Sequence, residues 1–222
     1  MSVLERLRGG LIVSVQPEPA SVLNTPETIA LLARCAVANG AAGLRVEGSL
    51  RIAAVRAALP DVPLIGIVKR AHPGFAPYIT STPEEIAEVA AAGADVVAFD
   101  ATARPRAGES SVADLVAAAH ERGLIAMGDC SEAADAAAAT AAGAEIVATT
   151  LAGYTAATQG LDQPALELLA ALVTRHPFAV CEGGIATPQQ ARAAFEAGAS
   201  AIVVGTAITN VDALVRRFVL FL

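Results

Sequence analysis

The sequence predicts one closed α/β domain, a (β/α)8 barrel of the TIM and phosphate-binding type, spanning residues 1–222. Three observations predict this fold. A helix-ending pattern recurs four times along the chain, short apolar strands alternate with helical segments, and glycine-rich turns follow the last two strands. No linker or break in composition indicates a second domain.

The recurring pattern is a helix that ends at a glycine, followed by an apolar or β-branched run. Its glycines are separated by 53, 50 and 55 residues: Gly40, Gly93, Gly143 and Gly198. Glycine accepts the left-handed conformation that commonly ends a helix. The spacing is too long for one β-α unit and fits two, so four copies predict eight strands and eight helices.

The expected strands are short and apolar, as strands covered on both faces should be. They fall near 10–15, 43–47, 64–69, 95–100, 124–129, 145–150, 178–182 and 201–205. Thr25, Thr82 and Thr187 each precede a proline and read as helix N-caps. Regular alternation predicts a parallel sheet; eight units favour a closed barrel, and an open doubly wound sheet is the alternative.

Composition excludes several classes of protein. Hydrophobic residues make up 55% of the chain, but the longest uncharged run, 146–161, contains threonines, glycines and a glutamine and is too polar for a membrane span. No charged segment with an apolar core opens the chain, so we expect a cytoplasmic protein. A net charge of −7 argues against nucleic acid, and an anionic ligand would need a local positive site.

Lys69 is the only lysine among 15 lysines and arginines. Arginine stays protonated in proteins, whereas a desolvated lysine can lose its proton. A unique lysine therefore suggests a position that needs a removable proton, although codon bias would leave the same pattern.

The active residues of such barrels lie at the carboxyl ends of the strands. The residues expected there are mostly polar: Gln16, Arg45, Lys69, Asp100, Asp129, Thr149, Thr150, Glu182 and Gly205. Lys69 and Glu182 form a plausible catalytic acid/base pair, and Lys69 could alternatively form a Schiff base. The alternative is that these are ordinary charged residues in solvated loops.

Two glycine-rich turns, 182–185 and 204–208, follow the seventh and eighth expected strands. Glycine lets backbone amides approach an anion closely, and these loops are the usual phosphate site of the fold. We therefore expect phosphate binding there, by Gly183, Gly184, Gly205 and Thr206.

Neither a metal nor another cofactor is expected. Of the three histidines, only His72 falls in a loop at the expected mouth, so no ligand cluster can be assembled. No dinucleotide fingerprint follows the first strand. Cys130 and Cys181 have no evident base beside them and read as structural thiols.

Taken together, several segments resemble the N-acetylmannosamine-6-phosphate 2-epimerases. The similar segments are 10–14, 66–70, 99–106, 153–155, 182–185 and 204–209. The resemblance implies a cofactor-free isomerase that interconverts N-acetylmannosamine 6-phosphate and N-acetylglucosamine 6-phosphate, a step in sialic acid breakdown. It also implies a catalytic lysine at Lys69 with Glu182 as its carboxylate partner. The positions matching the sugar site are Gln16, Arg45, Asp129 and Tyr154.

The sequence departs from the family pattern at Glu47, where asparagine is usual, at Ala152, where serine is usual, and at Asn210, where arginine is common. A catalytically weak sugar-phosphate-binding barrel, or another phosphosugar epimerase or lyase, is therefore the alternative function. The apolar C-terminal end, 216–222, predicts a homodimer with the last helix at or near the interface.

Overall fold

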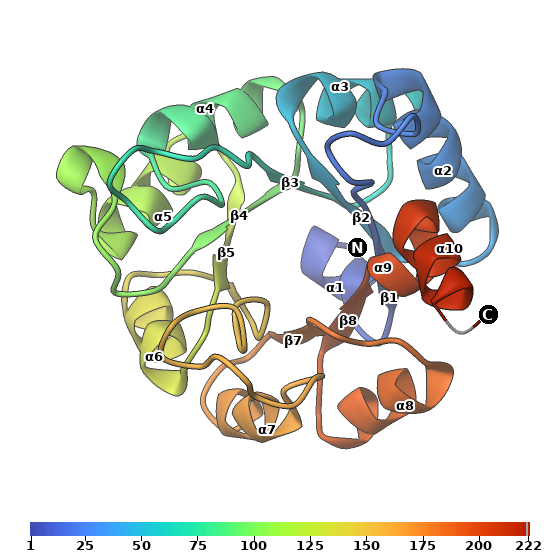
Figure 1. The fold of residues 1–222 in the computed structure, drawn as a ribbon. Helices are drawn as coiled ribbons and strands as arrows, with labels where there is room; N and C mark the ends of the chain where they lie inside the picture. Colours follow the sequence, from blue (N-terminus) through green and yellow to red (C-terminus); the bar gives the residue numbers. More distant parts are fainter. Residues whose placement is uncertain (221) are drawn as a thin grey trace.

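The computed structural model describes residues 1–220 and 222 and contains a closed barrel of eight parallel strands. Each strand pairs with the next along the chain, and β8 pairs with β1 to close the ring (Figure 1). The strands are β1 (Leu11–Val15), β2 (Gly43–Glu47), β3 (Leu64–Ile67), β4 (Val96–Asp100), β5 (Ile125–Asp129), β6 (Ile146–Ala148), β7 (Ala179–Glu182) and β8 (Ala201–Val204). The predicted barrel is thus confirmed.

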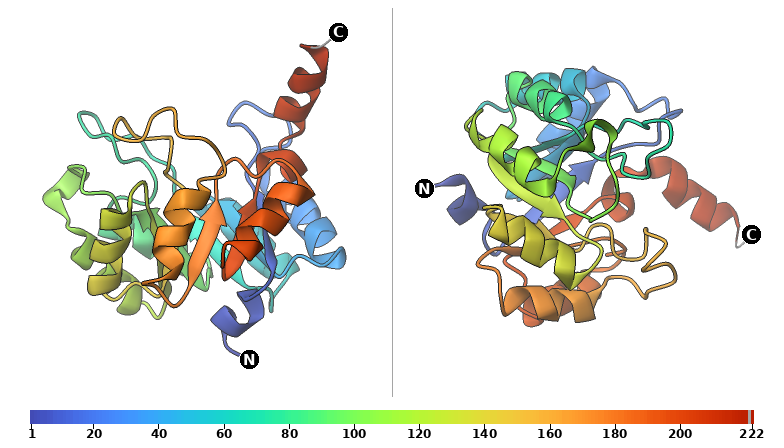
Figure 2. Two further views of the ribbon diagram at one scale, coloured as in Figure 1. Left: turned by 90° about the horizontal axis from the view of Figure 1, so that it is seen from below. Right: turned by 90° about the vertical axis from the view of Figure 1, so that its left-hand side faces the viewer.

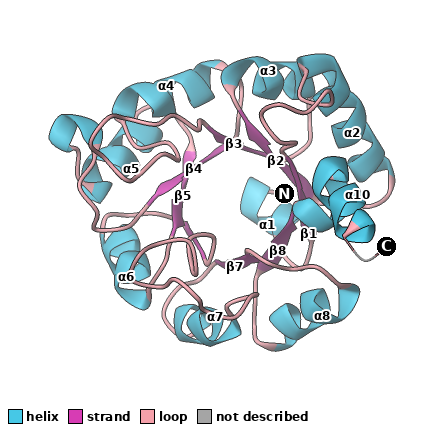
Figure 3. Cartoon of the chain, viewed as in Figure 1, coloured by secondary structure: helices cyan, strands magenta, loops and turns pink. Residues whose placement is uncertain are grey.

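Helices α2 to α8 surround the ring of strands (Figure 3). The helices are α1 (Val3–Leu7), α2 (Pro26–Ala38), α3 (Ser49–Ala58), α4 (Pro83–Ala91), α5 (Val112–His120), α6 (Ala133–Ala141), α7 (Leu166–Val173), α8 (Pro188–Glu196), α9 (Thr206–Thr209) and α10 (Val211–Val219). A 3-10 turn over Ala107–Glu109 precedes α5. No helix in the described part of the chain is long and apolar enough to cross a membrane.

Three helices begin, and four helices end, at the residues that the sequence indicated. The hydroxyls of Thr25, Thr82 and Thr187 accept backbone N–H groups in the first turns of α2, α4 and α8. The four repeated glycines have left-handed φ angles of 98°, 88°, 104° and 99° (Gly40, Gly93, Gly143 and Gly198). These capping predictions are confirmed.

The inside of the barrel is a packed apolar core. Ile65 and Ile67 on β3 belong to this inner cluster, together with Phe178 before β7 and Val180 on it. Leu7 of α1 is fully buried in the same cluster. Its helix lies at the end of the barrel opposite the mouth (Figure 2). Two buried carboxylates, Asp100 and Asp129, are the last residues of β4 and β5, at the carboxyl end of the barrel.

The third strand is shorter than predicted. β3 ends at Ile67, and Lys69 instead forms an antiparallel bridge with Ile79. The Arg70 N–H donates to the Tyr78 carbonyl at 2.9 Å, so the chain after β3 pairs with its own returning segment. This pairing holds Lys69 at the mouth rather than inside the strand.

The last helix is the least enclosed part of the fold. α10 has no buried residue and projects from the mouth side of the barrel (Figure 2). Its exposed apolar side chains include Val215, Phe218 and Val219. Phe221, part of the apolar end noted in the sequence, lies outside the described residues.

Candidate active site

The mouth of the barrel holds a pocket of about 590 Å³. Nine of the ten site residues expected from the sequence line it: Gln16, Arg45, Lys69, Tyr154, Glu182, Gly183, Gly184, Gly205 and Thr206. The tenth, Asp129, is fully buried and hydrogen-bonded to Arg45. The strand ends thus bring together residues that are far apart in the sequence.

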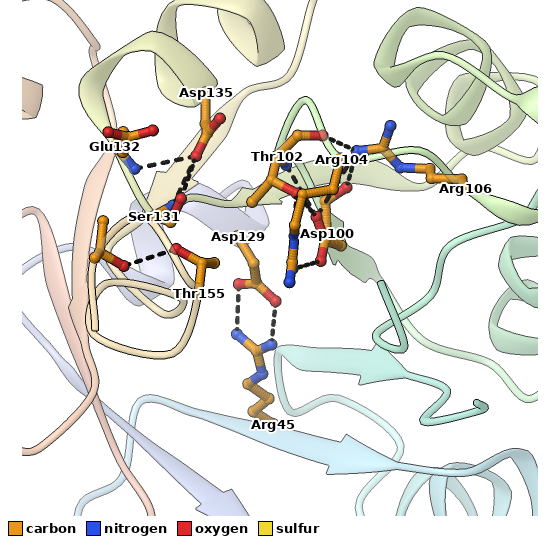
Figure 4. Close-up of polar contacts among 11 residues, drawn as sticks. Arg45, Asp100, Thr102, Arg104, Arg106, Asp129, Ser131, Glu132, Asp135 and Thr155 are labelled. Atoms are coloured by element: carbon orange, nitrogen blue, oxygen red, sulfur yellow. Dashed lines mark hydrogen bonds and ion pairs between the residues drawn. The ribbon is translucent and has the colours of Figure 1, made fainter. Parts of the chain in front are cut away.

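Arg45 points into the barrel from β2 and forms the floor of the site. Its guanidinium donates to both carboxylate oxygens of Asp129, at 3.0 and 2.5 Å, in the fork geometry visible in Figure 4. Arg45 also contacts Glu182 Oε2 at 2.5 Å. Because Arg45 and Asp129 are each at most 1% exposed, this pair is fixed in position before any ligand enters.

Glu182 ends β7 and faces the pocket, with 13% of its side chain exposed. Burial raises its pKa to about 7, while the Arg45 guanidinium works in the opposite direction. The Thr150 hydroxyl lies 2.7 Å from Asp129 Oδ1 and 3.3 Å from Glu182 Oε2, and so links the two carboxylates. A carboxyl group with this pKa can exchange a proton near neutral pH.

Lys69 enters the pocket from the loop after β3. Its side chain is reached by solvent through the open mouth, yet the surrounding protein lowers its pKa by burial, and the charge of Arg45 lowers it further. Glu47, Glu182 and Asp129 act in the opposite direction. The net lowering enlarges the neutral, basic fraction of the amine.

The glycine-rich turns border the same pocket. Gly183 and Gly184 have φ angles of 104° and 65°, in the region that favours glycine. A Cβ at Gly184 would lie 2.2 Å from Gln163 Cβ, so the absence of a side chain at Gly184 leaves room for the β6–α7 loop that carries Gln163. The sequence identified these turns, but it did not indicate that Gln163 packs on them.

Asn210 lies at the N-terminus of α10, and its side chain accepts the Ala213 N–H at 2.9 Å. Asn210 and Arg217 both line the pocket. Sequence reasoning noted Asn210 but missed Arg217, because nothing in the pattern showed that α10 borders the mouth.

Tyr78 was also missed. It lies in the β3–α4 loop and lines the pocket, and burial followed by the charge of Asp129 raises its pKa. No local sequence signal marks this position, because its place depends on the antiparallel pairing of Ile79 with Lys69.

The Arg-Pro-Arg segment lies beside the site and supports it. Arg104 donates to Asp100 Oδ2 at 2.5 Å, and Arg106 donates to the Asp100 carbonyl at 2.8 Å (Figure 4). The Thr102 hydroxyl donates to Asp100 Oδ1 at 2.6 Å. These contacts fix the loop after β4.

The remaining candidate groups show no arrangement for metal binding or thiol chemistry. Within residues 1–220 and 222, no group of three His, Cys, Asp or Glu side chains could hold a metal ion. His72 contacts the buried carboxylate of Glu85 at 2.9 Å. Burial raises the pKa of the Cys130 thiol well above its usual value and that of Cys181 to about 11, so both thiols are protonated at neutral pH.

This fold and site define a (β/α)8 barrel with titratable groups gathered around a buried arginine at its mouth. Residues 29–221 match the family model described as "Putative N-acetylmannosamine-6-phosphate epimerase". A curated relative from Synechococcus elongatus, named as a 2-epimerase of that type, is 46% identical over 97% of this chain and 94% of its own. A Yersinia pestis relative with the same name is 44% identical over 93% of this chain and 87% of its own.

A solved structure agrees with these matches. The N-acetylmannosamine-6-phosphate 2-epimerase from Clostridium perfringens has a TM-score of 0.96 and 34% identity, covering 100% of this chain and 97% of its own. The chain belongs to the N-acetylmannosamine-6-phosphate 2-epimerase family. The resemblance stated from the sequence motifs is therefore confirmed.

Proposed function

We propose that this protein is an isomerase that interconverts N-acetylmannosamine 6-phosphate and N-acetylglucosamine 6-phosphate by removing and returning a proton at C2. The observation that carries the proposal is the placement of Lys69 and Glu182 in one pocket of a chain of this family. The reaction belongs to amino-sugar breakdown, and we place the protein in the cytoplasm and its pathway in sialic acid catabolism.

In this proposal Lys69 is the catalytic base. C2 lies next to the C1 aldehyde of the open-chain sugar, so loss of its proton gives an enolate rather than an isolated carbanion. The neutral amine takes the proton, and the resulting ammonium helps stabilise the enolate oxygen. Return of a proton to the opposite face of C2 inverts the centre. The lowered pKa of Lys69 supports this role.

Glu182 is the second catalytic group. The sugar ring must open before C2 becomes acidic, and ring opening needs a group that can give and take protons. A carboxyl group with a pKa of about 7 suits this task near neutral pH. Its contact with Arg45 supports a fixed orientation toward the pocket.

Gln16, Arg45 and Tyr154 are proposed to bind the sugar, because all three line the pocket. Asp129 is assigned to the same group, and its two contacts to Arg45 support a role in holding that guanidinium in place. The sugar therefore meets an arginine whose position does not depend on the ligand.

The phosphate group is proposed to bind at Gly183, Gly184, Gly205 and Thr206. These residues border one pocket with Arg217, a cation that supports binding of an anion on a protein of net charge −7. Phosphate binding here would use backbone amides together with this charge.

The protein is further proposed to be a homodimer. α10 exposes Val215, Phe218 and Val219 to 55%, 75% and 61%. An exposed apolar helix face of this kind is typical of an interface, which supports a second copy of the chain as its partner.

An NMR time course with N-acetylmannosamine 6-phosphate, with and without a chelator, tests the proposed reaction. We expect signals of N-acetylglucosamine 6-phosphate to grow at the same rate in both samples. A protein that leaves the substrate unchanged would contradict the proposal, and conversion that stops with chelator would require a metal-dependent reaction instead.

A further inference from the structure

Glu47 lies at the carboxyl end of β2, and the proposed mechanism assigns it no role. Glu47 pairs in register with Ile67, the last residue of β3, so its side chain reaches the segment that carries Lys69. Glu47 Oε1 accepts the backbone N–H of Lys69 at 3.4 Å. One carboxylate therefore contacts the chain at the residue that we propose as the base.

The other oxygen of the same carboxylate is held by Arg51, in the first turn of α3. Arg51 pairs with Glu47 Oε2, and its Nε donates to the Glu47 carbonyl at 2.7 Å. Glu47 is 21% exposed and Arg51 is 24% exposed, so solvent screens this pair only in part. The carboxylate lies between a permanent cation and the backbone of Lys69.

We propose that Glu47 is a positioning residue for Lys69: it holds the Lys69 backbone at the barrel mouth and sets the local negative charge beside the amine, and Arg51 limits that charge. The proposal rests on the assignment of Lys69 as the base in the proposed function. Glu47 then contributes to how much of the amine is neutral at a given pH.

The charge of Glu47 acts on the Lys69 amine in the direction that the proposal requires. Among the carboxylates that raise the pKa of Lys69, Glu47 has the largest effect, ahead of Glu182 and Asp129. Burial and Arg45 act in the opposite direction. The other charged or titratable groups that line the pocket from neighbouring elements are Glu18, Tyr78, Tyr154 and Arg217.

Asp95 offers a matched control at the opposite end of the same elements. Its Oδ2 accepts the Leu64 N–H at the start of β3, at 2.9 Å, and pairs with Arg56 in the last turn of α3 at 2.7 Å. It therefore makes the same two kinds of contact as Glu47, but at the end of the barrel that lacks the pocket.

Because Lys69 is the only lysine, protein labelled with [ε-13C]lysine gives one resonance whose pH titration reports this amine directly. Neutralising Glu47 in Glu47→Gln should move the titration midpoint to lower pH. Arg51→Gln, which breaks the same ion pair from the other side, should move it to higher pH. Asp95→Asn should leave it at the native position.

Opposite shifts would separate a charge effect from simple loss of the ion pair, because a purely structural role predicts the same change in both variants. In pH profiles of kcat/KM, the acidic limb should move in the same directions, by about threefold in rate at a fixed pH. Equal shifts in Glu47→Gln and Arg51→Gln, or none beyond that of Asp95→Asn, would overturn the proposal. The titration needs no substrate, so its outcome is independent of whether the wild-type protein proves to be an epimerase.

Discussion

Arg45 carries its guanidinium into the barrel and meets two carboxylates there. The two carboxylate oxygens of Asp129 accept hydrogen bonds from the two terminal nitrogens of Arg45, and Glu182 accepts a third hydrogen bond. A buried charge of this kind costs much to desolvate, so the structure depends on keeping all partners together. The same contacts hold Glu182 toward the pocket.

Removal of the buried cation should therefore destabilise the protein. Arg45→Met keeps an unbranched apolar stem but leaves Asp129 without its counter-charge, and we expect a loss of about 3–5 kcal/mol in the free energy of unfolding. Urea denaturation measures this loss. Arg192→Met, an exposed position on α8, is the control and should change stability by less than about 0.5 kcal/mol. A loss in Arg45→Met as small as that of the control would contradict this account of the site.

The raised pKa of Glu182 predicts a pH-dependent stability. The folded protein binds this proton more tightly than the unfolded chain, where the pKa is near 4.5, so the contribution of Glu182 is fully present below pH 4.5 and is lost as pH rises through about 7. Glu182→Gln removes this dependence. Its stability relative to wild type should thus be greater at pH 8 than at pH 5 in urea denaturation, and a constant difference would show that the pKa is not raised.

At the level of elements, the loops at the carboxyl ends of the strands build the pocket. The β7–α8 and β8–α9 turns bring Gly184 and Gly205 to its border. A Cβ at Gly205 would lie 3.2 Å from Ser14 Cβ, so the β8–α9 turn is packed against β1 as well as open to the pocket.

Gly205→Val tests the phosphate assignment. The added side chain should weaken binding of the sugar phosphate, because it meets Ser14 and displaces the turn whose backbone would approach the anion. Isothermal titration calorimetry measures the affinity, and circular dichroism checks that the variant keeps its fold. Unchanged affinity in a folded variant would move the phosphate site to another part of the mouth.

The periodic signals in the sequence were sufficient to predict the eight strands and the helices between them, but not α1 or the short α9. The glycines that end helices and the Thr-Pro pairs that begin them act locally, so Gly93 and Thr82 could be assigned without a structure. The end of β3 was predicted wrongly, because the pairing of Lys69 with Ile79 depends on a loop that folds back. Strand ends predicted Arg45 and Glu182 as neighbours of Lys69, whereas the pocket contacts of Tyr78 and Arg217 depend on loop and helix paths that no periodicity encodes.

Over the whole molecule, charged side chains and exposed apolar side chains are unevenly distributed. The chain carries a net charge of −7, yet Arg45, Lys69 and Arg217 all line one pocket. Because Arg45 is already paired with Asp129 and Glu182, Lys69 and Arg217 are the cations that we expect to face an anionic substrate. The apolar side chains of α10 project beyond the same mouth.

We predict that the whole molecule assembles as a homodimer. Light scattering at micromolar concentration should give the mass of a dimer. Phe218→Glu places a charge on the exposed apolar face of α10 and should shift the mass toward that of a monomer, while Arg122→Glu at another exposed position should not. A monomeric wild-type protein would contradict the proposal of a homodimer.

The central claim is that Lys69 moves the proton at C2. Lys69→Arg keeps a positive charge at the mouth but removes the readily lost proton, since arginine stays protonated. Epimerisation in deuterium oxide, followed by proton NMR at C2, separates binding from proton transfer. We expect Lys69→Arg to lose about 10²–10⁴ in turnover and to incorporate label at C2 correspondingly slowly. Turnover and exchange near the native rate would make Lys69 a binding cation and assign the proton chemistry to another residue.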